Sequence, residues 1–185
     1  MKKAKTIFYV HSLLSISLVF SLFYNHRLIE HNKTHRDIHT SSKSIDKVLI
    51  KKSDRKLYLI NNNDIIKEYN IDLGFNPTGH KQKEGDGRTP EGKYKISGRN
   101  PNSKYHLSLR ISYPNSKDKK NAEKLGTNPG GDIMIHGLPN IITAIGFRKK
   151  LKKDWTLGCI AVQTNKEIQE IWDLVKDNTN VEIQP

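Results

Sequence analysis

The chain has 185 residues, a formal net charge of +13, 35% hydrophobic residues and a single cysteine. These values exclude a disordered tail, a multi-span membrane protein and an intramolecular disulfide, and they leave room for one globular domain. The basic excess favours polyanionic partners, which include nucleic acid, anionic lipid and the acidic polymers of a cell envelope.

The N-terminal segment 1–24 resembles an export signal. It carries three lysines in its first five residues and then runs without a charge from Thr6 to Tyr24. That length is close to the roughly 20 residues a helix needs to cross a bilayer, and no clear cleavage site follows. We predict an uncleaved signal anchor, with a cleaved signal peptide as the alternative, then a polar linker over 25–45 and a domain over 46–185.

This arrangement predicts an exported protein, in the periplasm or on the outer face of the cytoplasmic membrane, because N-terminal lysines remain on the cytoplasmic side. Membrane contact through the N-terminal segment is therefore expected, and nucleic acid is disfavoured as a partner. The sequence does not predict an oligomeric state.

Alternation of apolar and polar residues with a period of two predicts a series of strands. The first three strands are expected over 47–52, 55–60 and 64–74. Residues 76–92 are rich in turn formers and charge, which predicts a long surface loop. Long ordered loops in compact domains usually carry function.

The second half adds further strands and one clear helix. Strands are predicted over 93–97, 106–113 and 132–137, a polar connection with one helical turn over 115–131, and an edge strand over 180–185. The helix over 164–178 begins with a capping box and continues with apolar residues at helical spacing, among them Trp172, which we expect in the core. The sum is a mainly β domain, sandwich-like or barrel-like, with one or two helices.

Two residues, Cys159 and His136, are candidates for a catalytic pair. Cys159 follows Gly158 at the start of the apolar run "CIAV", and His136 ends the apolar strand "IMI". A Cys–His pair within hydrogen-bonding distance would give a thiolate–imidazolium couple with a depressed thiol pKa, and a glycine turn would aim backbone N–H groups at an oxyanion. From the residues alone, a structural cysteine is about as well supported. Trp155 is predicted as a core or turn-packing aromatic and Asp154 as a turn residue.

The stretches "IMIHGLPN" and "DWTLGCIAV" resemble the L,D-transpeptidase (YkuD-like) catalytic domain, in which a strand ends in His-Gly and Ser/Thr-x-Gly-Cys follows. The upstream stretches "GDGRTPEGKYKI", "RNPNSKYHLSLRISYPN" and "PGGDIMIHG" are similar to the YafK-like branch of that family. The resemblance runs from about Val48 to the C-terminal helix, and it implies the β-rich fold of this catalytic domain.

The resemblance also implies roles for individual residues. Cys159 would attack a peptidoglycan stem peptide after its third residue, a diamino acid, and His136 would be the general base. The N–H groups of Gly158 and Cys159 would form the oxyanion hole, Thr156 would fix the turn, and the carbonyl of Gly137 would hold the His136 tautomer. An amine would resolve the thioester into a cross-link or a protein anchored to the wall, and water would hydrolyse it. No cofactor or metal is implied.

One position departs from the family pattern. Many members carry Arg two residues after the cysteine, and this chain has Ala161 there. Arg148 is a candidate for the missing cation, and Tyr105, His106 and Arg110 are candidates for lining the cleft. Three functions stay open: a transpeptidase, an amide hydrolase of the same fold, and a non-catalytic basic wall-binding module.

Overall fold

The computed structural model describes residues 44–141 and 151–185. The elements of these residues are β1 (Lys47–Lys51), β2 (Lys56–Asn61), β3 (Asp64–Asp72), β4 (Gly92–Ser103), β5 (His106–Ile111), α2 (Ser116–Lys124), β6 (Met134–His136), β7 (Ile160–Val162), α4 (Asn165–Leu174) and β8 (Asn180–Gln184). The segment predicted as an anchor and nearly all of the predicted linker lie outside the described residues. Among the described residues, no helix is both long enough and apolar enough to span a membrane.

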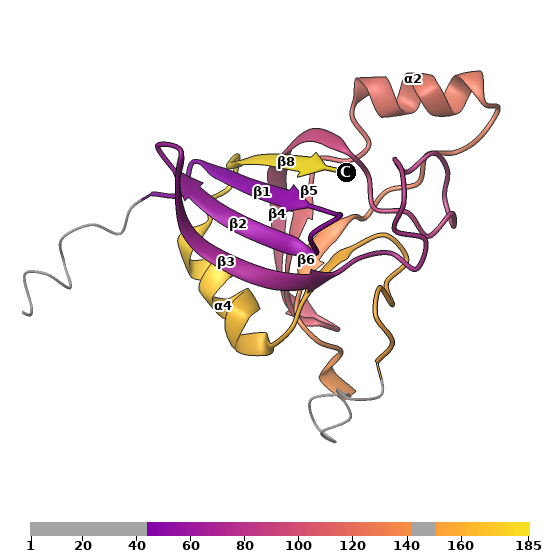
Figure 1. Ribbon diagram of the computed structural model, residues 1–185. Helices are drawn as coiled ribbons and strands as arrows, with labels where there is room; N and C mark the ends of the chain where they lie inside the picture. The colour runs from indigo at the N-terminus through magenta and orange to yellow at the C-terminus, as the bar shows by residue number, and fades with distance from the viewer. Residues whose placement is uncertain (1–43, 142–150) are drawn as a thin grey trace, which may run out of the picture. The chain divides into compact units, whose positions relative to one another are not determined.

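The strands form a closed barrel in the order β1-β2-β3-β7-β6-β5-β4-β8 (Figure 1). Two pairs are parallel, β1 with β8 and β6 with β7, and the other neighbours are antiparallel. The predicted mainly β class is confirmed. The prediction of an edge strand at the C-terminal end is wrong, because β8 pairs with β1 on one side and with β4 on the other. A closed barrel leaves no edge.

Side chains that alternate along the strands fill the barrel. Val48 and Ile50 of β1 and Leu57 and Leu59 of β2 are all 0% exposed, while their neighbours in sequence reach the surface to varying degrees. The antiparallel register pairs Val48 with Leu59 and Ile50 with Leu57, so these four residues share one face. The two-residue period of the sequence therefore reflects this inward-facing core.

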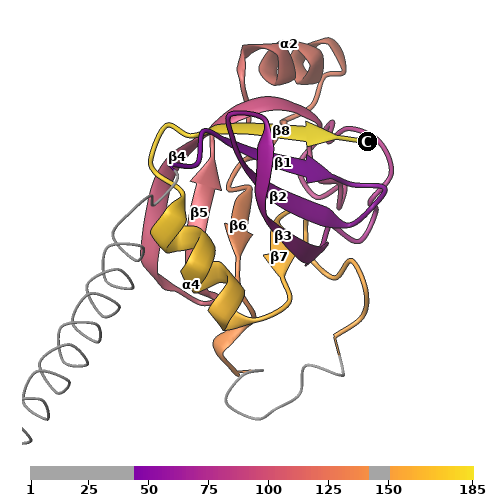
Figure 2. The ribbon, with the colours of Figure 1, turned by 60° about the vertical axis from the view of Figure 1, so that its left-hand side comes forward.

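Helix α4 adds its apolar face to the same core. Its buried residues Ile168 and Ile171 belong to the core cluster, and the helix packs against β5 and β7 (Figure 2). The predicted capping box is present, since Thr164 and Glu167 bond reciprocally at the helix start. Trp172 is only partly buried and packs against the core, in contact with the guanidinium of Arg99 at 4.8 Å from the ring centroid.

Helix α2 is longer than the single turn predicted from the sequence. It spans nine residues and begins with a capping box between Asn115 and Asp118. Only Asp118 and Ala122 of the helix are buried. Because so few apolar side chains mark its inner face, hydrophobic periodicity gives no signal for its length.

A buried lysine, Lys52, forms hydrogen bonds with the connection between β3 and β4. Lys52 is 2% exposed, and its ammonium donates to the carbonyls of Gly79 at 2.6 Å and Thr89 at 3.0 Å and to the Glu91 carboxylate at 2.7 Å. Burial lowers the pKa of Lys52, against the opposing effect of Glu91. The sequence predicted a surface loop here, but Lys81 and Thr89 are buried, so part of this loop is packed into the domain.

Candidate functional site

The parallel pairing of β6 and β7 brings His136 and Cys159 together from separate parts of the sequence. Ile135 lies opposite Ile160, and His136 lies opposite Ala161. Because side chains alternate along a strand, Ile135 and Ile160 point into the core while His136 and Cys159 point to the other side of the sheet. The two predicted catalytic side chains therefore share one face.

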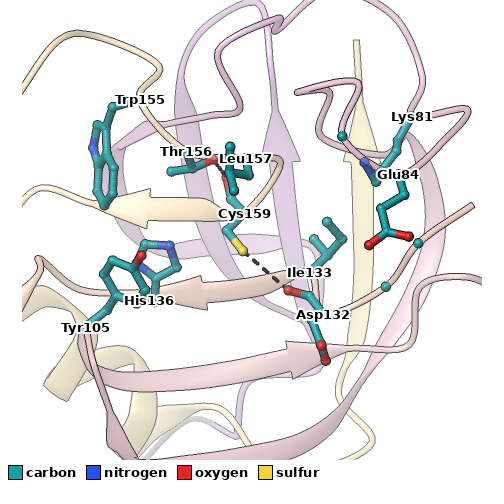
Figure 3. Close-up of a pocket in the computed structure, with 13 residues that line it drawn as sticks. Lys81, Glu84, Tyr105, Asp132, Ile133, His136, Trp155, Thr156, Leu157 and Cys159 are labelled. Carbon is teal, nitrogen blue, oxygen red and sulfur yellow. Dashed lines mark hydrogen bonds between the residues drawn. The ribbon is translucent and has the colours of Figure 1, made fainter.

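That face carries a pocket of about 510 Å³. It is lined by Lys81, Glu84, Gly85, Tyr105, Gly130, Gly131, Asp132, Ile133, His136, Trp155, Thr156, Leu157 and Cys159 (Figure 3). The Cys159 thiol donates a hydrogen bond to the Asp132 carbonyl at 3.4 Å. The nucleophile candidate and the base candidate thus line one pocket.

The His136 ring is almost completely enclosed. It is 3% exposed, with the Tyr105 ring centroid at 4.4 Å and the Trp155 ring centroid at 5.7 Å. Its Nδ1 lies 2.7 Å from the Gly137 carbonyl oxygen. Because a carbonyl can only accept, we assign the proton to Nδ1, which leaves the Nε2 lone pair as the basic site. Burial lowers the pKa of His136 to about 4, although the bond to Gly137 opposes this shift.

The surroundings of the Cys159 thiol favour its neutral form. Burial raises its pKa and the nearby Asp132 adds to the rise, while a hydrogen bond from the Met134 backbone and the charge of Lys81 oppose it. The pKa of the Cys159 thiol is thus displaced in the direction opposite to the one expected for a thiolate–imidazolium couple. Burial disfavours the charged form of both partners, so the resting pair is a thiol beside a neutral imidazole.

The buried imidazole predicts a loss of stability in acid. The ordinary pKa of histidine is 6.5 and that of His136 in the folded protein is about 4, so the unfolded chain binds more protons between these values. The free energy of unfolding should therefore fall as pH drops through this window, by up to about 3 kcal/mol. Denaturant unfolding of wild type and His136→Gln at several pH values between 7 and 4 measures the effect. The variant should lack it, and parallel curves for the two proteins would contradict it.

Thr156 fixes the turn that presents the cysteine. Its hydroxyl donates to the Cys159 carbonyl at 2.7 Å and accepts from the Gly158 N–H at 3.1 Å. Its backbone bonds to Leu73 at 3.1 Å and to Phe75 at 2.9 Å, which ties the turn to the end of β3. The N–H of Gly158 is thus engaged inside the turn.

Gly158 occupies a position that a larger residue cannot fill. Its φ is +131°, and an added Cβ would lie 2.7 Å from the Arg88 carbonyl oxygen and 3.2 Å from the Ile133 Cδ1. We expect Gly158→Ala to lower the free energy of unfolding by about 2–4 kcal/mol, since backbone strain and a clash with backbone add together. Gly126→Ala is the matched control, because Gly126 also has a positive φ but nothing within 4 Å of the added Cβ. Equal losses in thermal unfolding would contradict this expectation, because the φ of Gly158 is also less accessible to alanine than the +63° of Gly126.

Of the other residues predicted to line the cleft, some line the pocket and others do not. Tyr105 lines the pocket, whereas His106 is not among its lining residues. Arg110 does not line it either, but its guanidinium lies 2.8 Å from the carboxylate of Asp132, which does. Arg148 lies outside the described residues.

The positions of Trp155 and Asp154, which lie beside the turn, can be compared with the sequence predictions. Trp155 was predicted as a packing aromatic, but it lines the pocket and helps to enclose His136. Asp154 acts as a turn residue, since its carboxylate pairs with Arg55 at 2.8 Å and accepts from the Leu73 N–H at 3.1 Å.

Sequence reasoning missed Lys81, Glu84 and Asp132. The first two lie in the loop after β3, whose length and turn formers predicted a functional segment without indicating which side chains reach the site. Asp132 belonged to a predicted strand, and the glycines before it were the only local signal that the backbone lines a pocket.

Comparisons with known proteins agree with this fold. The family model of the YkuD L,D-transpeptidase catalytic domain matches residues 45–183. YafK of Escherichia coli (strain K12) is 32% identical over 100 residues, which cover 52% of this chain and 32% of that protein. The chain therefore matches about a third of the length of this curated relative.

Solved structures give the same result. The helical cell shape determining protein Pgp2 from Campylobacter jejuni is 27% identical, with a TM-score of 0.57 over 77% of this chain and 48% of its own. Bd1075 from Bdellovibrio bacteriovorus is 29% identical, with a TM-score of 0.51 over 78% of this chain and 49% of its own. Because the family model matches residues 45–183 and the fold agrees with these solved structures, this chain belongs to the YkuD family of L,D-transpeptidase catalytic domains.

Proposed function

We propose that this protein is a cysteine-dependent acyltransferase that acts on peptidoglycan stem peptides. The observation that carries the proposal is the placement of the only cysteine and a neutral, tautomer-fixed histidine on one pocket face, within a YkuD domain. The similarity to a protein described as determining helical cell shape supports a role in the cell wall.

The first chemical step transfers a proton within the neutral pair. When the substrate carbonyl approaches Cys159, Nε2 of His136 accepts the thiol proton and the sulfur forms a bond to the carbonyl carbon. We assign the resulting oxyanion to the N–H of Cys159. The Gly158 N–H contributes only if it exchanges its bond to the Thr156 hydroxyl for the oxyanion.

In the following steps His136 again donates and accepts protons. As the intermediate collapses, the C–N bond breaks and the His136 imidazolium gives its proton to the leaving amine, which leaves a thioester on Cys159. An acceptor amine or a water molecule then attacks the thioester, and His136 takes a proton from it. As this second intermediate collapses, the C–S bond breaks and His136 gives that proton to the sulfur, which restores the thiol. Amine attack gives a cross-link or a wall-anchored protein, and water attack gives hydrolysis.

Transfer and hydrolysis start from the same thioester and differ only in the nucleophile that attacks it, so an analysis of the products distinguishes them. Incubating the full chain with defined muropeptides and analysing intact products by mass spectrometry separates them. Cross-linked dimers support the transferase, and trimmed monomers alone support the amide hydrolase. Muropeptides left unchanged by both wild type and Cys159→Ala would leave only a wall-binding module.

The proposed site of action is outside the cytoplasm, with the chain tethered by residues 1–24. The uncharged run behind the N-terminal lysines supports this placement. Protease added to intact spheroplasts should cut the catalytic domain. Cleavage only after lysis would contradict the proposal.

A further inference from the structure

Lys81 is a rigid cation on the wall of the pocket. It is 4% exposed, and its ammonium donates to the Lys83 carbonyl at 3.0 Å and to the Asp86 carboxylate at 2.8 Å. An ammonium has three N–H donors, and these contacts use two of them. Among the described residues that line the pocket, Lys81 is the only one with a Lys or Arg side chain.

The partner of Lys81 stays ionised. Burial opposes ionisation of Asp86, but hydrogen bonds from Lys81 and from the backbone N–H groups of Gln82, Arg88 and Lys83 outweigh it and lower the pKa of Asp86 to about 2. The ion pair therefore holds the ammonium in place without consuming its third donor.

Glu84 lines the same pocket as Lys81. Figure 3 shows Lys81 and Glu84 on the same side of the pocket, across Cys159 from His136. Glu84 is exposed, and its carboxylate accepts one hydrogen bond from Asn128 at 3.1 Å. The two side chains therefore bring a positive and a negative charge to the lining of one pocket.

The position where many family members carry a cation cannot supply one here. Ala161 is 0% exposed and does not line the pocket. The charge of Lys81 nevertheless reaches the nucleophile, since it is among the groups that lower the pKa of Cys159.

We propose that Lys81 and Glu84 are the residues that select the acyl donor, by binding a side chain that ends in both a carboxylate and an ammonium. Lys81 receives the carboxylate and Glu84 the ammonium. This inference rests on the proposed function, in which the leaving amine takes its proton from His136. The leaving group then lies on the His136 side of Cys159, so the opposite side faces the part of the substrate that stays in the thioester.

Three donor peptides that differ only in the third residue test the inference. The third residue ends in an ammonium and a carboxylate (diaminopimelate), in an ammonium alone (lysine) or in a carboxylate alone (2-aminopimelate). The full wild-type chain should show the highest kcat/KM with the first. Lys81→Met should lower kcat/KM for both carboxylate-bearing donors by about 10- to 100-fold more than for the lysine donor. Glu84→Gln should reduce the preference for the ammonium-bearing donors by about two- to fivefold.

Asp86→Asn is the matched control, because it breaks the same ion pair and leaves the Lys81 cation in place. If Lys81 only braces the loop, both Lys81→Met and Asp86→Asn lower turnover of all three donors equally, and that result overturns the inference. Binding of the three peptides to Cys159→Ala, with and without Lys81→Met, provides a readout that needs no turnover. If the peptides bind in a Lys81-dependent way but wild type does not turn them over, the proposed function is refuted and the subsite is supported. If wild type turns over all three peptides without selectivity, the subsite is refuted and the proposed function is supported.

Discussion

Replacing Cys159 with alanine is expected to reduce thioester formation and peptide transfer by at least about a thousandfold, because no other side chain in the pocket can replace the thiol as nucleophile. The residues that line the pocket include no serine and no second cysteine, and Thr156 is buried with its hydroxyl bonded on both sides. Intact-protein mass spectrometry after mixing with a donor peptide measures the acyl adduct directly, and product analysis measures transfer.

The same variant should remain folded. Cys159 is half-buried at the mouth of the pocket and is not part of the hydrophobic core cluster. Its thermal unfolding should therefore lie close to that of wild type. Cys159→Ser is a second control, since it preserves the hydrogen-bonding capacity while removing most of the nucleophilicity. Full transfer by Cys159→Ala would exclude the proposed mechanism, whatever the state of the fold.

Replacing His136 with glutamine is expected to lower kcat/KM by about 10²- to 10⁴-fold, the usual contribution of a general base. The reason is the neutral resting pair: with both pKa values displaced by burial, the thiol gives up its proton only to an adjacent base. In wild type, kcat/KM should stay level through neutral pH and fall as pH approaches about 4, where His136 becomes protonated and can no longer accept the proton.

The pH profile distinguishes a base from a structural residue. His136→Gln should show a low rate without this acid limb, because the titrating group has been removed. If the acid limb remains in the variant, another group controls it and His136 is not the base. Measurements above pH 4 need a parallel unfolding curve, since the buried imidazole also affects stability in acid.

Local sequence patterns predicted much of the fold. The alternation of Val48 and Ile50 with polar neighbours placed β1, and the capping box at Thr164 placed α4. The same patterns could not reveal that β8 closes a barrel, because pairing with β1 depends on contacts between residues far apart in sequence. They also could not give the length of α2, which is held by polar caps and one buried alanine.

The sequence was enough to predict which residues are the nucleophile and base candidates, but not how their surroundings shift the pKa values of these residues. Cys159 and His136 followed from the glycine turn, the strand end and the family resemblance. The sequence could not show that aromatic rings from Tyr105 and Trp155 bury the imidazole, whose pKa burial lowers to about 4. Burial comes from tertiary packing, so it is absent from any local pattern.

The parallel pairing of β1 with β8 bears on how the domain reaches its native state. These are the first and last strands of the barrel, and their pairing joins residues with a very large separation in sequence. Domains dominated by such non-local contacts fold slowly, because a long loop must close before the contacts form. Because β8 is the last of these strands in the sequence, the barrel can close only after that part of the chain has been made. The barrel that carries Cys159 and His136 is therefore complete only once its first and last strands have paired.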